Sequence, residues 1–296
     1  MGVSPLGCSV CLMMLVVTCA WWILLGSSDR LVTPAGEGGP GSAGTVRLSR
    51  VNEQPTHISC PLGDRTASSP AGRVPTDRRA DTSVLRIATF NVEWLFDGID
   101  DSPKHVPWQG AAAADAHLKR VASAVDGLDA DILNLVEVEG CFMLHRLVEA
   151  LPHAQRRAGY APYVVGSSDS ATRQQIGMLS RLRPQVAPQR TQHREPYPMP
   201  GSGCGYYDVS TGSKTTGVSK HYWTVFDVPG LGGKELLVVA AHLKARPNDP
   251  QSCAQREGQA AVLATAVQEH GAGRHVIVIG DLNDFDPDVA DSSGNR

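Results

Sequence analysis

The sequence predicts an α/β domain, because short strands rich in β-branched residues alternate with amphipathic helices along most of the chain. The clearest strand is the Val/Ile run His275–Ile279, which is too short for a helix and which we expect to be buried on both faces. The clearest helix, Ala254–Glu269, precedes it. With 296 residues and 42% hydrophobic content, the chain can form one such domain plus accessory segments.

Residues 1–28 are predicted to be a signal peptide or a signal anchor. Residues 6–26 carry no charge and are about as long as the ~20 apolar residues that span a bilayer. The length of this run favours an anchor, whereas the small residues from Gly26 onward would suit cleavage by a signal peptidase. We therefore expect a secreted or membrane-anchored protein. The first flanking cation, Arg30, leaves the orientation of the domain open.

A segment rich in Gly, Pro and Ser, residues 29–83, predicts a flexible linker before a folded domain at 84–296. The net charge of -3 and the pI near 6.4 argue against a protein that coats nucleic acid through bulk positive charge. They leave open an enzyme that meets phosphates through a metal ion and a few local cations. No internal repeat is present, and no oligomer is predicted.

Within the domain, apolar alternation and apolar runs mark the strands, and apolar residues at helical spacing mark the helices. Further strands are expected at 85–93, 131–138, 161–165, 174–181, 221–228 and 235–242. Further helices are expected at 112–128 and 142–151. The strands on either side of the Ser/Asp-rich loop and of the turn Pro229-Gly-Leu-Gly-Gly233 are predicted to pair as hairpins. Residues 184–217 are predicted to be a long irregular insert.

Four cysteines lie beyond the apolar segment, and an even number permits disulfides in an oxidising compartment. Cys204 and Cys253 flank the second predicted hairpin, so we expect them to form a disulfide that stabilises the fold by roughly 3–4 kcal/mol. Cys141, beside a predicted helix, is expected to be a buried thiol.

Several predicted strands end in polar residues of matching kind. These residues are Asn91 with Glu93, Glu137, His242, and Asp281 with Asn283. Strand ends that converge on one edge are where α/β enzymes assemble their sites. Residues two positions apart share one side of a strand, so Asp281 and Asn283 are expected together, as are Asn91 and Glu93. A carboxylate can orient a metal ion or a water while an amide donates to a phosphoryl oxygen, although Asp and Asn are also ordinary turn residues.

Taken together, five segments resemble the motifs of the endonuclease/exonuclease/phosphatase superfamily, the DNase I-like proteins. They are Ile87-Ala-Thr-Phe-Asn-Val-Glu-Trp94, Ala130-Asp-Ile-Leu-Asn-Leu-Val-Glu-Val138, Ile176-Gly-Met-Leu-Ser-Arg181, Val239-Ala-Ala-His-Leu-Lys244 and Ile279-Gly-Asp-Leu-Asn-Asp284. They occur in the family's order, and the match runs from Val84 to the end. The resemblance implies a four-layered sandwich in which two mainly antiparallel β-sheets pack together and are flanked by helices.

The resemblance also implies a metal site. Glu137 matches the glutamate that holds a divalent cation, usually Mg²⁺, with Mn²⁺ possible. Asn91 matches an asparagine near the metal and the scissile phosphate. Glu93 matches a more variable position that sometimes carries a second carboxylate. Because Mg²⁺ keeps several waters, a sparse set of protein ligands is expected.

The remaining matches imply catalytic roles. His242 matches the residue that hydrogen-bonds a phosphoryl oxygen, and Asp281 and Asn283 match the pair that orients the attacking water and the phosphate. The family's final Ser-Asp-His motif, which supplies the general base, has no counterpart after Asp288, so the resemblance implies a domain that is incomplete at its C-terminus. Because general-base catalysis typically contributes ~10²–10⁴ in rate, we expect weak hydrolysis by the sequence as given, compared with a version extended by that motif.

The expected function is that of a metal-dependent phosphodiester hydrolase, with nuclease-like activity favoured. The preference rests on residues 89–94 and on the insert ending in Lys220-His221-Tyr222-Trp223, which are similar to those of secreted nuclease-like members. Nucleic acid or another phosphodiester is therefore the expected partner, together with a membrane if the apolar segment is retained. A membrane-associated sphingomyelinase or phosphoinositide phosphatase is one alternative. A catalytically inactive member that binds phosphate or a partner is the other.

Overall fold

The computed structural model describes residues 57–60, 76–99, 106–207 and 214–285. The predicted targeting segment and most of the predicted linker lie outside these ranges. Within them, no helix combines the length and the apolar character needed to cross a membrane.

The first β-sheet has five strands in the order β1-β4-β5-β3-β2. They are β1 His57–Ser59, β2 Ile87–Leu95, β3 Ile132–Val138, β4 Ala161–Val165 and β5 Gln175–Ser180. β2 and β3 run parallel, and the other neighbours are antiparallel. The predicted antiparallel pairing of β4 with β5 is confirmed.

The second β-sheet has four strands in the order β11-β10-β9-β6. They are β6 Val186–Gln189, β9 Lys220–Phe226, β10 Leu236–His242 and β11 His275–Asp281. β9 and β10 form the predicted hairpin, while β10 and β11 run parallel. The segment predicted to be irregular contains β6 and also a small separate sheet of β7 Glu195–Tyr197 and β8 Lys214–Thr216.

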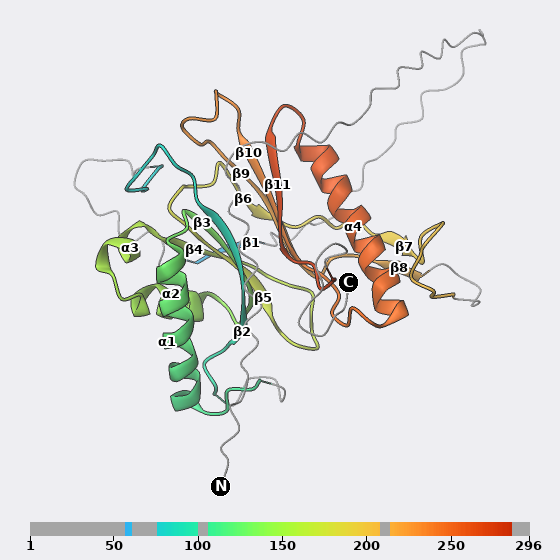
Figure 1. Ribbon diagram of the computed structural model, residues 1–296, viewed down its shortest axis with the longest axis horizontal. Coiled ribbons are helices and arrows are strands. Elements are labelled where there is room, and N and C mark those ends of the chain that lie inside the picture. The colour runs from blue at the N-terminus through green and yellow to red at the C-terminus, as the bar shows by residue number, and fades with distance from the viewer. Residues whose placement is uncertain (1–56, 61–75, 100–105, 208–213, 286–296) are drawn as a thin grey trace, which may run out of the picture.

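The helices lie outside the two sheets, which gives the predicted four layers. They are α1 Ala111–Leu128, α2 Cys141–Ala150, the short α3 Ala154–Gly159 and α4 Pro250–His270. Figure 1 shows α1 and α2 beside the sheet that contains β2 and β3, and α4 beside the sheet that contains β9, β10 and β11. α4 begins four residues earlier than predicted, because Asp249 caps it by accepting a hydrogen bond from the Ser252 N–H at 2.8 Å.

The central strand β10 shows how the layers are held together. Its even-numbered residues from Leu236 to Ala240 lie in the core between the two sheets, and its odd-numbered residues from Leu237 to Ala241 lie in the core beneath α4. Successive side chains of a strand point to opposite faces, so a strand that is apolar at every position can serve two cores. The third core lies between the first sheet and helices α1 and α2.

The prediction that the strand His275–Ile279 is buried on both faces is wrong. Val276 is 38% exposed and Val278 is 48% exposed, whereas Ile277 and Ile279 pack against the core between the sheets. The reason is the position of β11 at the edge of its sheet, where it pairs with β10 alone among the described strands. Gly280 is required beside β10, because a Cβ there would lie 1.8 Å from the Ala241 carbonyl oxygen.

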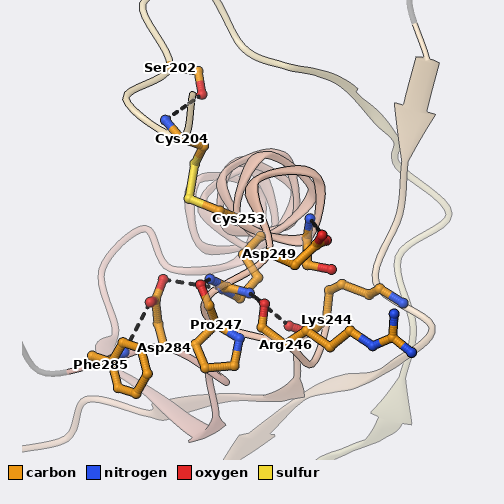
Figure 2. Close-up of a disulfide and its surroundings, with 11 residues drawn as sticks. Ser202, Cys204, Lys244, Arg246, Pro247, Asp249, Cys253, Asp284 and Phe285 are labelled. Atoms are coloured by element: carbon orange, nitrogen blue, oxygen red, sulfur yellow. Dashed lines mark hydrogen bonds and ion pairs between the residues drawn. A yellow bond between two sulfur atoms is a disulfide. The ribbon is translucent and has the colours of Figure 1, made fainter. Parts of the chain in front are cut away.

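Two disulfides join distant parts of the chain. Cys204 and Cys253 are bonded as predicted, with their Cα atoms 5.6 Å apart (Figure 2). The prediction that Cys141 is a buried thiol is wrong, because Cys141 is bonded to Cys60 with a Cα separation of 5.4 Å. The pairing of β1 with β4 brings Cys60 to the start of α2.

Two parts of the segment predicted to be a linker belong to the fold. β1 and Cys60 are joined to the first sheet and to α2. Farther along, Asp77 forms a β-bridge with Leu182, and the Arg78 guanidinium donates a hydrogen bond to the Gly159 carbonyl at 2.9 Å.

Candidate active site

The strand pairing of β2 and β3 becomes irregular near their C-terminal ends. These ends lie where the two sheets meet, which we call the inter-sheet edge. The pairing of β2 with β3 shifts register after Asn91, and the pairing of β3 with β5 shifts at Glu137. Glu93, Trp94 and Glu137 have left-handed backbones, with φ values of 52°, 60° and 68°. Such conformations are uncommon for residues with a side chain and persist where the surrounding structure fixes them.

The shift at Glu137 decides where its carboxylate points. Ile132 and Val136 face the core between the sheets, but Val138 packs in the helix-side core. Strict alternation would instead have placed Val138 with Val136 and turned Glu137 toward the helices. The register shift at Glu137 therefore directs its carboxylate toward the second sheet.

The Asn91 side chain joins the two sheets at this edge. Its amide nitrogen donates to Glu137 Oε1 at 3.1 Å and to Asp281 Oδ2 at 2.9 Å. Glu137 Oε2 also accepts a hydrogen bond from the Trp94 N–H at 3.2 Å. Burial raises the pKa of Glu137, and the hydrogen bond from Asn91 acts in the opposite direction. Two carboxylates from different sheets thus converge on one amide.

The His242 imidazole lies beside both carboxylates. Its Nε2 is 3.9 Å from Glu137 Oε1 and 3.9 Å from Asp281 Oδ2, which is too far for a direct hydrogen bond. Burial, together with the positive charge of Lys220, lowers the pKa of His242 to about 4, so the ring is neutral near pH 7. Its buried Nδ1 has no hydrogen-bond partner among the described residues.

Asn283 and Glu93 lie differently from the regular strand positions that the sequence suggests. β11 ends at Asp281, and Asn283 has a φ of 53° with its side-chain amide donating to the Leu243 carbonyl at 3.0 Å. The Asn283 N–H also donates to Asp281 Oδ1 at 3.0 Å. Glu93 is exposed, and in the described part of the chain its carboxylate makes no hydrogen bond or ion pair. The structure therefore brings Asn91, Glu137, His242 and Asp281 together and leaves Glu93 apart.

Sequence reasoning missed a buried cation at this site, Lys220. Lys220 is the residue paired with His242 across the β9–β10 hairpin. Its Nζ donates to Asp169 Oδ2 and to Gln174 Oε1, both at 3.1 Å. The predicted strand began one residue later, at His221, so the prediction left Lys220 outside the hairpin, whereas β9 begins at Lys220 and places it opposite His242.

We expect the substitution Lys220→Met to lower the free energy of unfolding by about 2–3 kcal/mol, because the Asp169 carboxylate, only 16% exposed, would lose its cation. Adding Asp169→Asn should recover part of this loss, since no unpaired carboxylate would remain. Urea unfolding measures both effects. Lys234→Met, which removes an exposed cation from the turn before β10, is the matched control. A Lys220→Met variant as stable as that control would contradict the prediction.

The donors at this site suit a hard divalent cation. One oxygen of Glu137 and one oxygen of Asp281 both accept from the side-chain amide of Asn91, and a divalent cation could bind both carboxylates at this place. No group of three or more acidic, His or Cys side chains in the described ranges is placed to hold a metal by itself. Such a sparse set fits Mg²⁺, which binds through one or two carboxylates and completes its shell with water and substrate phosphate.

Comparison with known proteins identifies the family. Residues 88–294 match the Endonuclease/Exonuclease/phosphatase family, and this range contains all the strand ends described above. The chain belongs to this family. Endonuclease/exonuclease/phosphatase members take their name from the hydrolysis of phosphate esters. No curated protein matches the sequence.

Solved structures with a similar fold come from several organisms. An endonuclease/exonuclease/phosphatase from Beutenbergia cavernae is 19% identical, with a TM-score of 0.40 and coverage of 71% of this chain and 49% of that one. A family protein from Bacteroides thetaiotaomicron is 18% identical, with a TM-score of 0.39 and coverage of 67% and 63%. TDP2 from Caenorhabditis elegans is 17% identical, with a TM-score of 0.36 and coverage of 70% and 49%. This chain spans less than two thirds of each of these relatives.

Proposed function

We propose that this protein is a divalent-metal-dependent phosphodiester hydrolase that acts on nucleic acid outside the cytosol. The observation that carries the proposal is the cluster at the inter-sheet edge, where the Asn91 amide links Glu137 to Asp281 and His242 lies beside both carboxylates. Two carboxylates can hold a divalent cation and orient a water, and an amide and a neutral imidazole can donate hydrogen bonds to a phosphoryl oxygen.

Each residue of the cluster has a distinct task in this proposal. Glu137 and Asp281 would hold Mg²⁺ or Mn²⁺, which supplies charge neutralisation at the phosphate when bound. The neutral His242 ring can donate a hydrogen bond from Nε2 to a phosphoryl oxygen. Asn283 donates one side-chain N–H to the Leu243 carbonyl, and its second side-chain N–H, which has no partner among the described residues, can donate to the phosphate. Asp281 Oδ1 can orient the attacking water.

The disulfides favour a substrate outside the cytosol. Disulfides are rare in cytosolic proteins, where thiols are kept reduced, and this fold has two of them. Phosphoinositides lie in the cytoplasmic leaflet, so a phosphoinositide phosphatase fits these bonds poorly. The loop directly after His242 carries two exposed cations, Lys244 and Arg246, which suit a polyanion better than a sphingomyelin headgroup with no net charge.

An assay panel tests this proposal. We expect the protein with Mg²⁺ or Mn²⁺ to hydrolyse DNA or RNA at least about tenfold faster than sphingomyelin or inositol phosphates. Chelation with EDTA should lower turnover by about 10²-fold or more, because the carboxylates alone cannot neutralise the phosphate. Faster hydrolysis of sphingomyelin would establish the lipid alternative. Mg²⁺ binding without hydrolysis of any substrate would establish the inactive, phosphate-binding alternative.

A further inference from the structure

The loop that follows β10, residues 244–247, carries two exposed cations, Lys244 and Arg246. Within the part of the chain that the structure describes, neither the Lys244 Nζ nor the Arg246 guanidinium makes a hydrogen bond or an ion pair. Figure 2 shows the two side chains extending in the same direction, away from Asp284 and the disulfide. The Asp249 carboxylate, whose pKa is lowered first by its hydrogen bonds from Ser252 and then by the charges of Arg246 and Lys244, lies nearby but forms no ion pair with either cation. Both cations can therefore still bind an anionic ligand.

A buried guanidinium fixes the backbone of this loop from below. Arg256 of α4, only 4% exposed, donates to the carbonyl oxygens of Lys244 and Arg246 at 3.2 Å and of Pro247 at 3.1 Å. Gln259, one turn farther along α4, accepts a hydrogen bond from the Lys244 N–H at 2.8 Å. Surface loops normally have few hydrogen bonds to the rest of the protein and are mobile. The three hydrogen bonds from the buried Arg256 therefore hold the backbone of this loop in one conformation.

The same arginine ties the loop to the candidate active site. Arg256 Nε bonds Asp284 Oδ2 at 3.2 Å, and Asp284 follows Asn283 directly. The Leu243 N–H donates to the Asp281 carbonyl at 2.9 Å. This hydrogen bond joins the segment after β10 to the end of β11. Arg246 has a left-handed backbone, with a φ of 74°, which these contacts hold in place.

Chain geometry places both cations within reach of phosphates next to the reacting one. Lys244 is two residues beyond His242 and Arg246 is four, so their Cα atoms lie within about 7 Å and about 14 Å of the His242 Cα. Along one strand of duplex DNA, phosphates recur about every 3.4 Å of helix axis. Both cations can therefore meet phosphates flanking the one held at Glu137, Asp281 and His242.

We propose that Lys244 and Arg246 form a phosphate-binding subsite for the nucleotides that flank the scissile phosphate of a polynucleotide. The inference rests on the proposed function and specifies its substrate as a chain of phosphates rather than a single ester. The loop is already ordered by Arg256, so binding would freeze little additional backbone. The Arg246 guanidinium can meet a phosphate through two hydrogen bonds, and Lys244 adds a point charge.

Binding to a fluorescently labelled single-stranded DNA oligonucleotide in EDTA, followed by anisotropy over a range of salt concentrations, tests the subsite without cleavage. The double variant Lys244→Gln/Arg246→Gln should weaken binding about tenfold at low salt and reduce the slope of log Kd against log salt by about 1.4, which corresponds to two lost phosphate contacts. The control Lys119→Gln/Lys234→Gln removes two exposed cations from α1 and from the distant turn of the β9–β10 hairpin, and should leave the slope unchanged. Equal slopes in the two double variants, or no binding by the unsubstituted protein, would overturn the inference.

Hydrolysis separates this inference from the proposed function. A p-nitrophenyl mononucleotide diester has no flanking phosphate, so the Lys244→Gln/Arg246→Gln variant should turn it over normally while its KM for the oligonucleotide rises about tenfold. Equal losses on both substrates would show that the loop acts on the reaction itself, and would overturn the subsite. If neither substrate is hydrolysed but the salt slopes differ as expected, the proposed function fails, and Lys244 and Arg246 remain assigned to the binding of polynucleotide phosphates alone.

Discussion

The substitution Glu137→Gln should remove most of the Mg²⁺ affinity of the site and lower kcat/KM for phosphodiester hydrolysis about 10³-fold, or about 4 kcal/mol of barrier. A glutamine has the size of the glutamate and can still accept a hydrogen bond from the Asn91 amide or the Trp94 N–H. The side-chain volume is therefore unchanged, while the negative charge and one of the two hydrogen bonds accepted by Glu137 are lost. The cation site that we propose at this edge has two carboxylates, Glu137 and Asp281, and the variant keeps only Asp281.

Calorimetric titration with Mg²⁺ and Mn²⁺ measures the affinity directly, and unfolding by urea checks that the variant remains folded. Glu139→Gln is the matched control, because Glu139 lies two residues farther along and its carboxylate accepts the Asp97 N–H at 2.9 Å, away from Asn91. The control should bind metal normally. Unchanged affinity in Glu137→Gln would place the cation elsewhere, at Asp281 or Glu93.

Removing the disulfide between Cys60 and Cys141 with the double variant Cys60→Ala/Cys141→Ala should lower the free energy of unfolding by about 4 kcal/mol. The bond joins residues 81 apart, and in the chain-entropy model a loop of this length contributes about that much. The bond also anchors β1, a strand of only three residues that, among the described strands, is hydrogen-bonded to β4 alone. We therefore expect β1 to detach as well.

Urea unfolding gives the stability change, and hydrogen exchange at β4 reports whether β1 stays paired, since β1 lies against Tyr163 and Val165. The variant Cys204→Ala/Cys253→Ala is the comparison. It opens a loop of 49 residues, should cost about 4 kcal/mol as well, and should leave exchange at β4 unchanged. A loss of less than about 1 kcal/mol for the Cys60 and Cys141 pair would show that the bond contributes little to the fold.

Local patterns were sufficient to predict most of the fold. The apolar run of β10 and the helical spacing in α1 arise from which residues are apolar, and burial of those residues decides the secondary structure. β1 was missed because three residues within a Gly- and Pro-rich segment have no measurable period. Without β1, nothing in the sequence placed Cys60 near Cys141, so Cys141 was expected to be a free thiol.

The candidate site was predicted less completely than the fold. The sequence shows which strands end in Glu137, His242 and Asp281, because the polar residues begin where the apolar runs stop. It does not show the register shift at Glu137, which depends on pairing with β5 and without which the carboxylate would face the helices. The sequence also does not show that the two asparagines make different contacts. The Asn91 side chain donates to a carboxylate on each sheet, whereas the Asn283 side chain donates to the Leu243 carbonyl.

The sequence by itself determined the elements, the family resemblance and the chemical identity of the strand ends, because each of these depends on residues close together in the chain. Only the tertiary structure decided which of them meet. The hydrogen bond from Asn91 to Asp281 joins residues 190 apart, the Lys220–Asp169 pair depends on the first residue of β9 meeting the loop between β4 and β5, and the exposure of β11 depends on the order of strands in its sheet. The physical reason is that strand pairing and sheet packing depend on how much apolar surface the whole core buries. This quantity depends on residues far apart in the chain, so no local sequence pattern shows it.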